Sequence, residues 1–311
     1  MQYDFPEIRP PSEAGSYLLR VTRGCAWKKC VFCWRYGGTK FEIRNVDEIK
    51  KDILRMGEIF GYTTSAFIGD ADPLVHKHLD EIIRFLKQNY PHVSRVTAYA
   101  RAKTIAKMKE ERLKRLKESG LTRLHIGLES GDDEILKLMK KGATSEDMIK
   151  AGLKTKKFFE LSFYVIVGLG GIERSKQHVI NTSKVINEVA PDFVRVRTLT
   201  IGYNNEIVDM VEEGVLTPLT PIQQLEELER LVKSIEVKTY FTCDHISNYL
   251  VLDGADWFNR IIFKGVEGIL PNERERMIKE IRKAKEIVKN LKNKGVRILN
   301  CNDLIKLGVI M

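Results

Sequence analysis

SYLLRVTRGCAWKKCVFCWRY, residues 16–36, joins a short apolar strand to a loop that carries three cysteines. These are Cys25, Cys30 and Cys33, spaced C-x4-C-x2-C, and the next cysteine in the chain is Cys243. Three thiolates with no fourth nearby can hold a metal centre and leave one coordination position open. Because a substrate can bind at an open position, the spacing favours an enzyme over a structural metal site.

Beyond this loop, short apolar runs alternate with segments of helical periodicity. The predicted strands span 16–22, 65–69, 95–100, 122–130, 163–170 and 192–201. The predicted helices span 47–60, a segment that starts at an N-cap Asp72 and runs past Leu86, 103–118, one or two helices within 132–160, and 173–189. Six strands separated by helices predict an α/β fold, a partial (β/α)6 TIM-type barrel around a parallel sheet.

Alternation within the strands predicts which polar side chains point into this barrel, because helices cover the outer face of a parallel sheet. The inward set comprises Thr97, Tyr99, Arg101, Arg123, His125, Gly127, Glu129, Arg195 and Arg197. An amphipathic strand with one solvated face is the alternative interpretation of each pattern.

The alternation weakens from residue 203 onward, where helices are predicted over 221–236 and 273–294 and a strand over 237–242. We therefore expect an N-terminal lead (1–15), a barrel core (16–202) and a C-terminal extension (203–311). The extension is mixed, mainly helical, and expected to cover the substrate side of the barrel.

Composition describes an ordinary globular protein, with 43% hydrophobic and 30% charged residues. No apolar run is long enough to span a membrane, the start has no secretory pattern, and five cysteines suit a reducing compartment, so a cytoplasmic location is expected. The net charge of +10 would help RNA binding, but basic and acidic residues are interspersed, which favours a solvated surface.

The cysteine loop favours iron–sulfur or zinc chemistry, since both prefer thiolates. A structural zinc site needs a fourth ligand, and a plant-type ferredoxin, which shares the C-x4-C-x2-C spacing, also has a fourth cysteine. Here the later cysteines, Cys243 and Cys301, are far away in sequence. An open three-cysteine cluster is preferred; zinc and a non-catalytic electron carrier remain the alternatives.

With this loop placed after the first strand of a six-stranded barrel, the chain resembles the radical S-adenosylmethionine (SAM) superfamily. Members usually space the cysteines C-x3-C-x2-C with an aromatic before the third, a position that Phe32 fills here. The additional residue between Cys25 and Cys30 is a departure from that pattern. The resemblance implies that Cys25, Cys30 and Cys33 bind a [4Fe–4S] cluster.

Further motifs follow in the order that this resemblance implies. IGDAD (68–72) is similar to the turn that holds the SAM amino group, with Gly69 and Asp70 at the matching positions. GLES (127–130) is similar to a signature of the branch containing tRNA methylthiotransferases and anaerobic coproporphyrinogen oxidase, which implies SAM contacts for Glu129 and Ser130. VIVGLGG (165–171) resembles the glycine motif beside adenine, at Gly168.

Arg101, Arg195 and Arg197 are candidates to pair with the SAM carboxylate or an acidic substrate, because guanidinium binds carboxylates bidentately. Surface salt bridging is the alternative for each. CDHISNYL (243–250) is similar to a stretch in a poorly characterised, coproporphyrinogen-oxidase-like group. That similarity makes His245, Asn248 and Tyr249 candidates on the substrate side, with His245 and Tyr249 as the catalytic candidates. A structural cap or a core-edge position is the alternative for both.

The resemblance implies an anaerobic radical enzyme of oxidoreductase or rearrangement type, with a [4Fe–4S] cluster and SAM as cofactors. It would generate a 5′-deoxyadenosyl radical that abstracts hydrogen from a small, carboxylate-bearing metabolite. Expected partners are that substrate and a reductant such as ferredoxin or flavodoxin. RNA modification is the alternative reaction, and a non-catalytic electron carrier is the alternative of another class.

Overall fold

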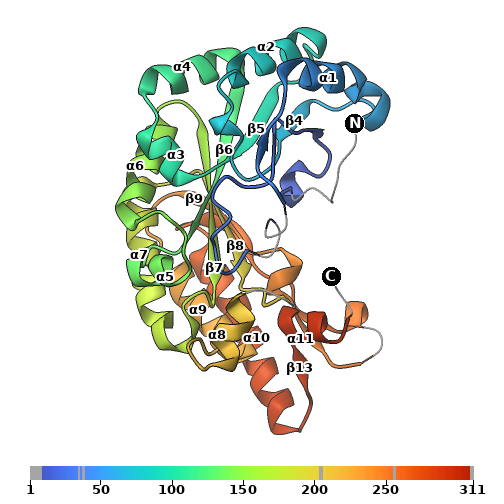
Figure 1. The fold of residues 1–311 in the computed structure, drawn as a ribbon. Helices are drawn as coiled ribbons and strands as arrows, with labels where there is room; N and C mark the ends of the chain where they lie inside the picture. The colour runs from blue at the N-terminus through green and yellow to red at the C-terminus, as the bar shows by residue number, and fades with distance from the viewer. Residues whose placement is uncertain (1–8, 34–35, 37–38, 203–205, 255–256, 309–311) are drawn as a thin grey trace. The chain divides into compact units, whose positions relative to one another are not determined.

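The computed structural model describes residues 9–33, 36, 39–202, 206–254 and 257–308 (Figure 1). The first eight residues of the expected lead and the start of the extension at 203 therefore lie outside the described residues. The chain divides into two compact units. The first comprises residues 1–28, 35–127 and 150–162, and the second comprises 29–34, 128–149 and 163–311.

The strands and helices follow the predicted alternation closely. The strands are β1 (Tyr17–Leu19), β2 (Thr22–Arg23), β3 (Glu42–Ile43), β4 (Ser65–Ile68), β5 (Arg95–Ala100), β6 (Leu121–Glu129), β7 (Glu160–Val167), β8 (Phe193–Thr198), β9 (Thr239–Thr242), β10 (Leu250–Leu252), β11 (Ile261–Phe263), β12 (Glu267–Leu270) and β13 (Ile298–Leu299). The α-helices are α1 (Val46–Phe60), α2 (Leu79–Asn89), α3 (Ala102–Lys107), α4 (Glu110–Ser119), α5 (Asp133–Leu138), α6 (Ser145–Lys156), α7 (Gly171–Val189), α8 (Glu206–Glu212), α9 (Pro221–Ser234), α10 (Arg274–Asn293) and α11 (Cys301–Lys306). Short 3-10 helices are η1 (Pro11–Glu13), η2 (Pro73–Val75), η3 (Ile246–Asn248) and η4 (Trp257–Arg260).

The main sheet has the strand order β1-β4-β5-β6-β7-β8-β9-β12. Neighbours from β1 to β6 run parallel, as do β8 and β9, whereas β12 pairs antiparallel with β9. This mainly parallel sheet confirms the predicted α/β class and fits a partial TIM-type barrel. Two small sheets, β11-β10-β13 and β2-β3, complete the pairing of the described strands.

In the first unit, α1, α2 and α4 pack side by side over β4, β5 and β6 (Figure 1). The stripes predicted from helical spacing face inward: Ile49, Ile53 and Met56 of α1 are fully buried, as are Ile82 and Leu86 of α2. Burying such a side chain contributes about 1.5–3 kcal/mol. The amphipathic spacing therefore fixes which face of each helix meets the sheet.

The predicted inward face of the first unit is filled by side chains rather than open. The rings of Phe67 and Tyr99 are 5.0 Å apart, and that of His125 is 6.0 Å from Tyr99. The buried Glu13 reaches His125 across 3.4 Å. For Tyr99 of β5 and His125 of β6 the predicted inward direction is confirmed, and both rings belong to a packed interior.

Two helix predictions are wrong. The helix expected to start at Asp72 is replaced by η2, and α2 begins only at Leu79. The carboxylate of Asp72 makes no capping bond; it accepts from the Arg101 backbone N–H and the Thr104 hydroxyl instead. A capping side chain that is already bonded elsewhere cannot satisfy the first helical N–H groups.

The helix expected over 103–118 is two helices, α3 and α4, separated by extended backbone at Met108 and Lys109. Lys154 supplies the physical reason, because its Nζ donates to the carbonyls of Ala106 and Met108 at 2.9 and 2.8 Å. Because these carbonyls accept from Lys154, they satisfy the C-terminal end of α3 without the backbone N–H groups that would continue the helix. The end at Gly120 was predicted correctly, and its φ of +113° suits glycine.

In the second unit, α7, α9 and α10 pack together, and Glu229 joins α9 to α10. Its carboxylate accepts hydrogen bonds from Lys233, Arg282 and Lys285 at 2.7–2.9 Å. Burial opposes ionisation of this carboxyl, but the three cations outweigh it and lower the pKa of Glu229 to about 2. The interaction therefore stabilises the fold above the usual carboxyl pKa of 4.5.

We expect Glu229→Gln to lower the free energy of unfolding at pH 7 by about 2 kcal/mol. The difference from the wild type should shrink as pH falls from 5 toward 2, because the wild-type carboxylate then becomes protonated. Urea denaturation at pH 7, 4 and 3 measures it, with Glu286→Gln, an exposed position on α10, as the control. A difference that does not change with pH would contradict the assignment.

Within the described ranges, no helix combines the length and apolar character needed to cross a lipid bilayer.

Candidate functional site

The first part of the cysteine loop belongs to the first unit. Gly24 has a φ of +72° and packs against the Thr39–Lys40 backbone, so a side chain there would be strained. The Lys28 backbone N–H donates to Cys25 Sγ at 3.4 Å, and Lys28 itself has a φ of +37°. A tight turn thus presents the half-buried Cys25 sulfur with a backbone N–H beside it.

The second part of the loop belongs to the second unit and is held by packing. The Val31 N–H donates to the Met139 carbonyl at 3.1 Å, and Val31 is buried in an apolar cluster with Met139. The Cys33 N–H donates to the Cys30 carbonyl at 3.1 Å, which closes the two-residue spacing into a turn. Phe32, between them, packs against the same cluster.

The donor set suits an iron–sulfur cluster in its chemistry. All three loop cysteines are half-buried and none of the five cysteines forms a disulfide. Soft thiolate ligands favour iron–sulfur clusters and zinc over hard cations. No group of three His, Cys, Asp or Glu side chains lies close enough to hold a metal within the described part of the chain, so the ligand set stays a prediction.

The turn after β4 places Gly69 and Asp70 in the buried interior of the first unit. Asp70 has a φ of +63°, and Arg20 donates from Nε and Nη2 to its two carboxylate oxygens, each at 3.2 Å. Burial raises the pKa of Asp70 to about 6, against the opposing effect of Arg20. The predicted SAM residue is therefore part of a buried ion pair that fixes the turn.

Arg101 stands at the start of α3, and its guanidinium lies 5.0 Å from the centre of the Trp27 ring. Trp27 follows Cys25 by two positions, so a cation–π contact connects α3 to the cysteine loop within the first unit. The buried Asp72 accepts from the Arg101 N–H at 3.4 Å. Burial raises the pKa of Asp72 to about 6.

Glu129 and Ser130 lie at the end of β6 but point into different surroundings. Glu129 has a φ of +63° and accepts from Lys141 Nζ at 2.8 Å, and the same Nζ lies 5.7 Å from the Phe32 ring centre. Ser130 is fully buried; its Oγ accepts from the Asp132 N–H at 3.0 Å and lies 2.9 Å from His178 Nδ1. Of the two predicted SAM contacts, Glu129 thus lies beside the cysteine loop.

Gly168 begins the turn after β7 with a φ of +81°, and its N–H donates to Glu227 Oε1 at 2.7 Å. The other carboxylate oxygen of Glu227 accepts from the Ser175 hydroxyl. His178 Nε2 lies 3.7 Å from Glu227, and burial lowers the pKa of His178, which keeps the ring neutral. The carboxylate favours the Nε2–H tautomer, so Ser130 donates to Nδ1.

The glycine motif and the GLES turn are therefore connected through α7 and α9. Ser130, His178 and Glu227 are each at most 1% exposed, so this set has no access for a substrate. Instead, Ser130 accepts a hydrogen bond from the Asp132 N–H, and Glu227 accepts one from the Gly168 N–H. The set thus holds the backbone of two turns. The arrangement can fix the shape of both turns, and it cannot act as a hydrolytic triad.

The arginines of β8 lie on one half-exposed face, as predicted. Arg195 lies 5.3 Å from the Phe193 ring centre and Arg197 lies 5.5 Å from that of Tyr164. A cation–π contact of this kind helps to position each guanidinium on the strand. The role predicted for Arg195 in carboxylate binding remains a prediction.

His245 caps η3, since its Nδ1 accepts from the Ser247 N–H at 3.1 Å. Burial, followed by the nearby Arg197, lowers the pKa of His245 to about 3, so the ring is neutral with its proton on Nε2. Tyr249 packs against an apolar cluster of Val251, Leu299 and Leu304. Both positions thus have the structural role that the sequence offered as the alternative, and their catalytic role stays a prediction.

Cys243 is fully buried, and burial raises the pKa of its thiol to about 12. It therefore remains protonated at neutral pH and behaves as a small apolar residue.

The residues that sequence analysis missed are Arg20, Trp27, Lys141, His178 and Glu227. Arg20 gave a signal, because it is a charged residue inside the apolar strand SYLLRVT. For His178 the signal is weaker: it shares the buried face of α7 with Ser175 and Thr182 at helical spacing. Their partners lie far away in sequence and could not be inferred from the pattern.

The similarity of this chain to known proteins includes the cysteine loop and the turns described above. A family model described as the radical SAM superfamily matches residues 19–182. In sequence, the chain is 26% identical over 180 residues to an uncharacterized methyltransferase of Pyrococcus horikoshii, covering 57% of this chain and 38% of that protein. The chain thus spans well under half the length of that relative.

Two solved structures show the same fold. Coproporphyrinogen III oxidase (HemN) from Escherichia coli, described as a radical SAM enzyme, superposes with a TM-score of 0.56 at 17% identity, over 70% of this chain and 51% of that one. Elp3 of the archaeon Methanocaldococcus infernus superposes with a TM-score of 0.50 at 17% identity, over 91% of this chain and 64% of that one.

Proposed function

This chain belongs to the radical SAM superfamily, and from that premise we propose that it cleaves SAM reductively and uses the radical to abstract hydrogen from a small, carboxylate-bearing metabolite. The observation that carries the proposal is the family match over 19–182, which contains the cysteine loop and all three glycine-containing turns. When bound, a [4Fe–4S] cluster supplies the one electron that splits SAM into methionine and a 5′-deoxyadenosyl radical.

The chain's own residues then bind, orient and shield. Cys25, Cys30 and Cys33 would hold the cluster, in keeping with their thiol chemistry and partial exposure. Glu129, whose positive φ turns its backbone at the end of β6, would accept a hydrogen bond from SAM while Lys141 holds the carboxylate. Gly168 would bring backbone close to adenine, since a side chain there would be strained.

A carboxylate-bearing substrate is favoured by the arginines of β8. Arg195 and Arg197 share one face of the strand, each beside an aromatic ring that limits its rotamers. Two oriented guanidinium groups can bind a carboxylate bidentately. The neutral His245, near Arg197, can donate from Nε2 to a polar substrate group. RNA modification, the alternative supported by the charge of +10, would use the same radical.

Under strictly anoxic conditions, reconstituted protein with SAM and dithionite is expected to release 5′-deoxyadenosine and methionine in equal amounts. Liquid chromatography with mass detection measures both. A non-catalytic electron carrier would release neither, so their absence would contradict the proposal. RNA as the substrate would be indicated by RNA-dependent stimulation of the release, with an affinity that falls steeply with salt.

We expect Glu227→Leu to raise the Kd for SAM about tenfold, because the Gly168 N–H loses its acceptor and the turn after β7 loosens. Glu227→Gln should remain close to the wild type, since the amide oxygen can still accept this bond. Glu226→Leu, the adjacent and half-buried position, is the matched control. Iron content should be equal in all four proteins; equal SAM affinity in all four would contradict this role.

A further inference from the structure

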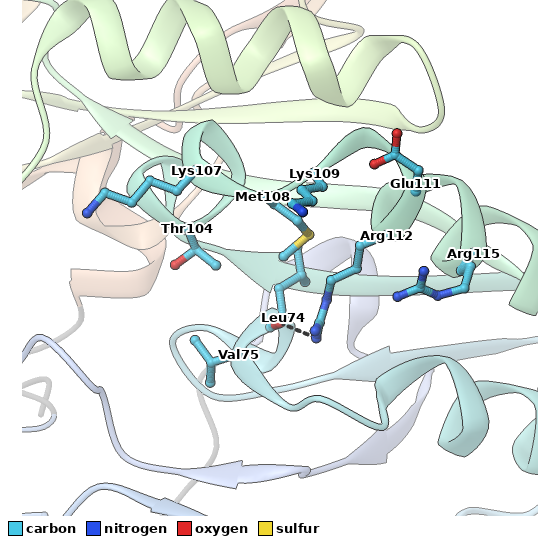
Figure 2. A pocket seen from close by; sticks show the side chains of 9 residues that line it. All are labelled: Leu74, Val75, Thr104, Lys107, Met108, Lys109, Glu111, Arg112 and Arg115. Carbon is cyan, nitrogen blue, oxygen red and sulfur yellow. Dashed lines mark hydrogen bonds between the residues drawn. The ribbon is translucent and has the colours of Figure 1, made fainter.

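A cavity of about 500 Å³ lies wholly within the first unit, between η2 and the α3–α4 junction (Figure 2). Leu74, Val75 and Met108 give it apolar walls. The charged residues that line it are four basic ones and one acid: Lys107, Lys109, Arg112, Arg115 and Glu111. The cavity therefore combines an apolar lining with an excess of positive charge.

This positive charge is not neutralised within the described part of the chain. Lys107, Lys109 and Arg115 are exposed, and no ion pair involves any of them there. Glu110, the next acidic residue, already pairs with Lys157. Such unpaired cations around one hollow attract an anionic surface and steer its approach.

Arg112 is the fixed member of this set. Its Nη2 donates to the carbonyls of Leu74 at 3.0 Å and His76 at 2.8 Å, which holds the guanidinium against η2 (Figure 2). Its Nε is buried and has no hydrogen-bond partner among the described residues. The Arg112 guanidinium therefore adds a positive charge of fixed position to the lining of the cavity.

A short series of contacts connects the cavity to the cysteine loop. Thr104, which lines the cavity, donates to the carboxylate of Asp72, and Asp72 accepts from the Arg101 N–H. The Arg101 guanidinium lies 5.0 Å from the Trp27 ring centre, two positions after Cys25. All of these residues belong to the first unit, so the basic cavity and the start of the loop are parts of one compact body.

We propose that this cavity and its basic rim are the docking surface for an acidic, one-electron carrier protein. The inference rests on the proposed function, which consumes one electron for each SAM cleaved. The carrier gives up one electron and the enzyme accepts one, and no bond or proton is exchanged at the docking surface. Charge complementarity supports an acidic partner, and the contacts to Trp27 connect the cavity to the part of the cysteine loop that carries Cys25.

The test compares two charge reversals of equal size. Lys107→Glu/Arg115→Glu alters the rim, and Lys176→Glu/Lys184→Glu alters exposed positions on α7 of the second unit. With a purified acidic flavodoxin as the probe, calorimetry at low salt should show a Kd about tenfold higher for the rim variant. The α7 variant should remain within about threefold of the wild type. Equal weakening in both variants, or no binding by the wild type, would overturn the docking surface.

A second measurement separates this inference from the proposed function. With dithionite as the reductant, the rim variant should release 5′-deoxyadenosine at the wild-type rate; with reduced flavodoxin, its KM for the carrier should rise about tenfold. Wild-type protein that is inactive with dithionite would refute the proposed function, while the binding measurement would still decide on the docking surface. If the rim variant loses affinity for poly(U) and not for flavodoxin, the cavity contacts RNA and the proposal is wrong.

Discussion

Cys30→Ala is expected to lose almost all bound iron, whereas wild-type protein reconstituted without oxygen should hold about four irons per chain. Cys30 is one of only three thiolates in the loop, and the two later cysteines are buried elsewhere. With two cysteine ligands left, two of the four irons of a cubane would lack a protein ligand. Release of 5′-deoxyadenosine should fall below detection, because the electron has no route to SAM.

Iron and sulfide analysis together with the visible absorption of the cluster measure this outcome. Cys301→Ala is the matched control, because this substitution also removes one thiol group from the chain. Cys301 is buried at the start of α11, away from the loop in sequence. That variant should keep its iron. The melting temperature of the metal-free proteins should differ little between Cys30→Ala and the wild type, because the Cys30 side chain is half exposed. Full iron retention by Cys30→Ala would contradict the ligand assignment.

The second large effect is expected at the buried ion pair of the first unit. Arg20→Leu removes the guanidinium that donates to both carboxylate oxygens of the fully buried Asp70. Leaving one buried charge unpaired costs about 3–5 kcal/mol of stability. Because the turn after β4 is fixed by this pair, the loss of stability should lower the urea concentration at the midpoint of unfolding at pH 7.5.

The dependence on pH has a definite sign. Burial already raises the pKa of Asp70 to about 6 in the wild type, above the usual 3.8, so the folded state binds a proton more tightly than the unfolded state. Stability from this group therefore rises as pH falls from 8 toward 4. Removing Arg20 strengthens that effect, so Arg20→Leu should lose less stability at pH 5 than at pH 8. Arg20→Leu/Asp70→Asn, which removes both charges, should recover much of the loss; no recovery would contradict the explanation.

The sequence was most informative where neighbours along the chain decide the structure. The stripe of Ile49, Ile53 and Met56 predicted α1, and the alternation around His125 predicted β6, because both patterns reflect burial of one face. The end at Gly120 of the helix predicted over 103–118 was also correct, since a left-handed residue after a helix favours glycine.

Tertiary partners decided the rest. The break at Met108 depends on Lys154, and the late start of α2 depends on an Asp72 carboxylate bonded to Thr104. Within the candidate site, the motifs located the turns, but not the groups that shape them. Arg20 bonds to Asp70 from 50 residues away, and Glu227 bonds to Gly168 from 59 residues away. No local pattern specifies such pairs, because each depends on how the strands and helices pack.

The packing of Val31 has a consequence for the order in which this protein matures. The Cys30–Cys33 turn is held by the Val31–Met139 hydrogen bond and by an apolar cluster, and neither requires a metal. Packing of the second unit therefore fixes the backbone of the turn that carries two of the three predicted ligands. If Cys30 and Cys33 ligate the cluster, folding of this unit would form the turn to which iron binds.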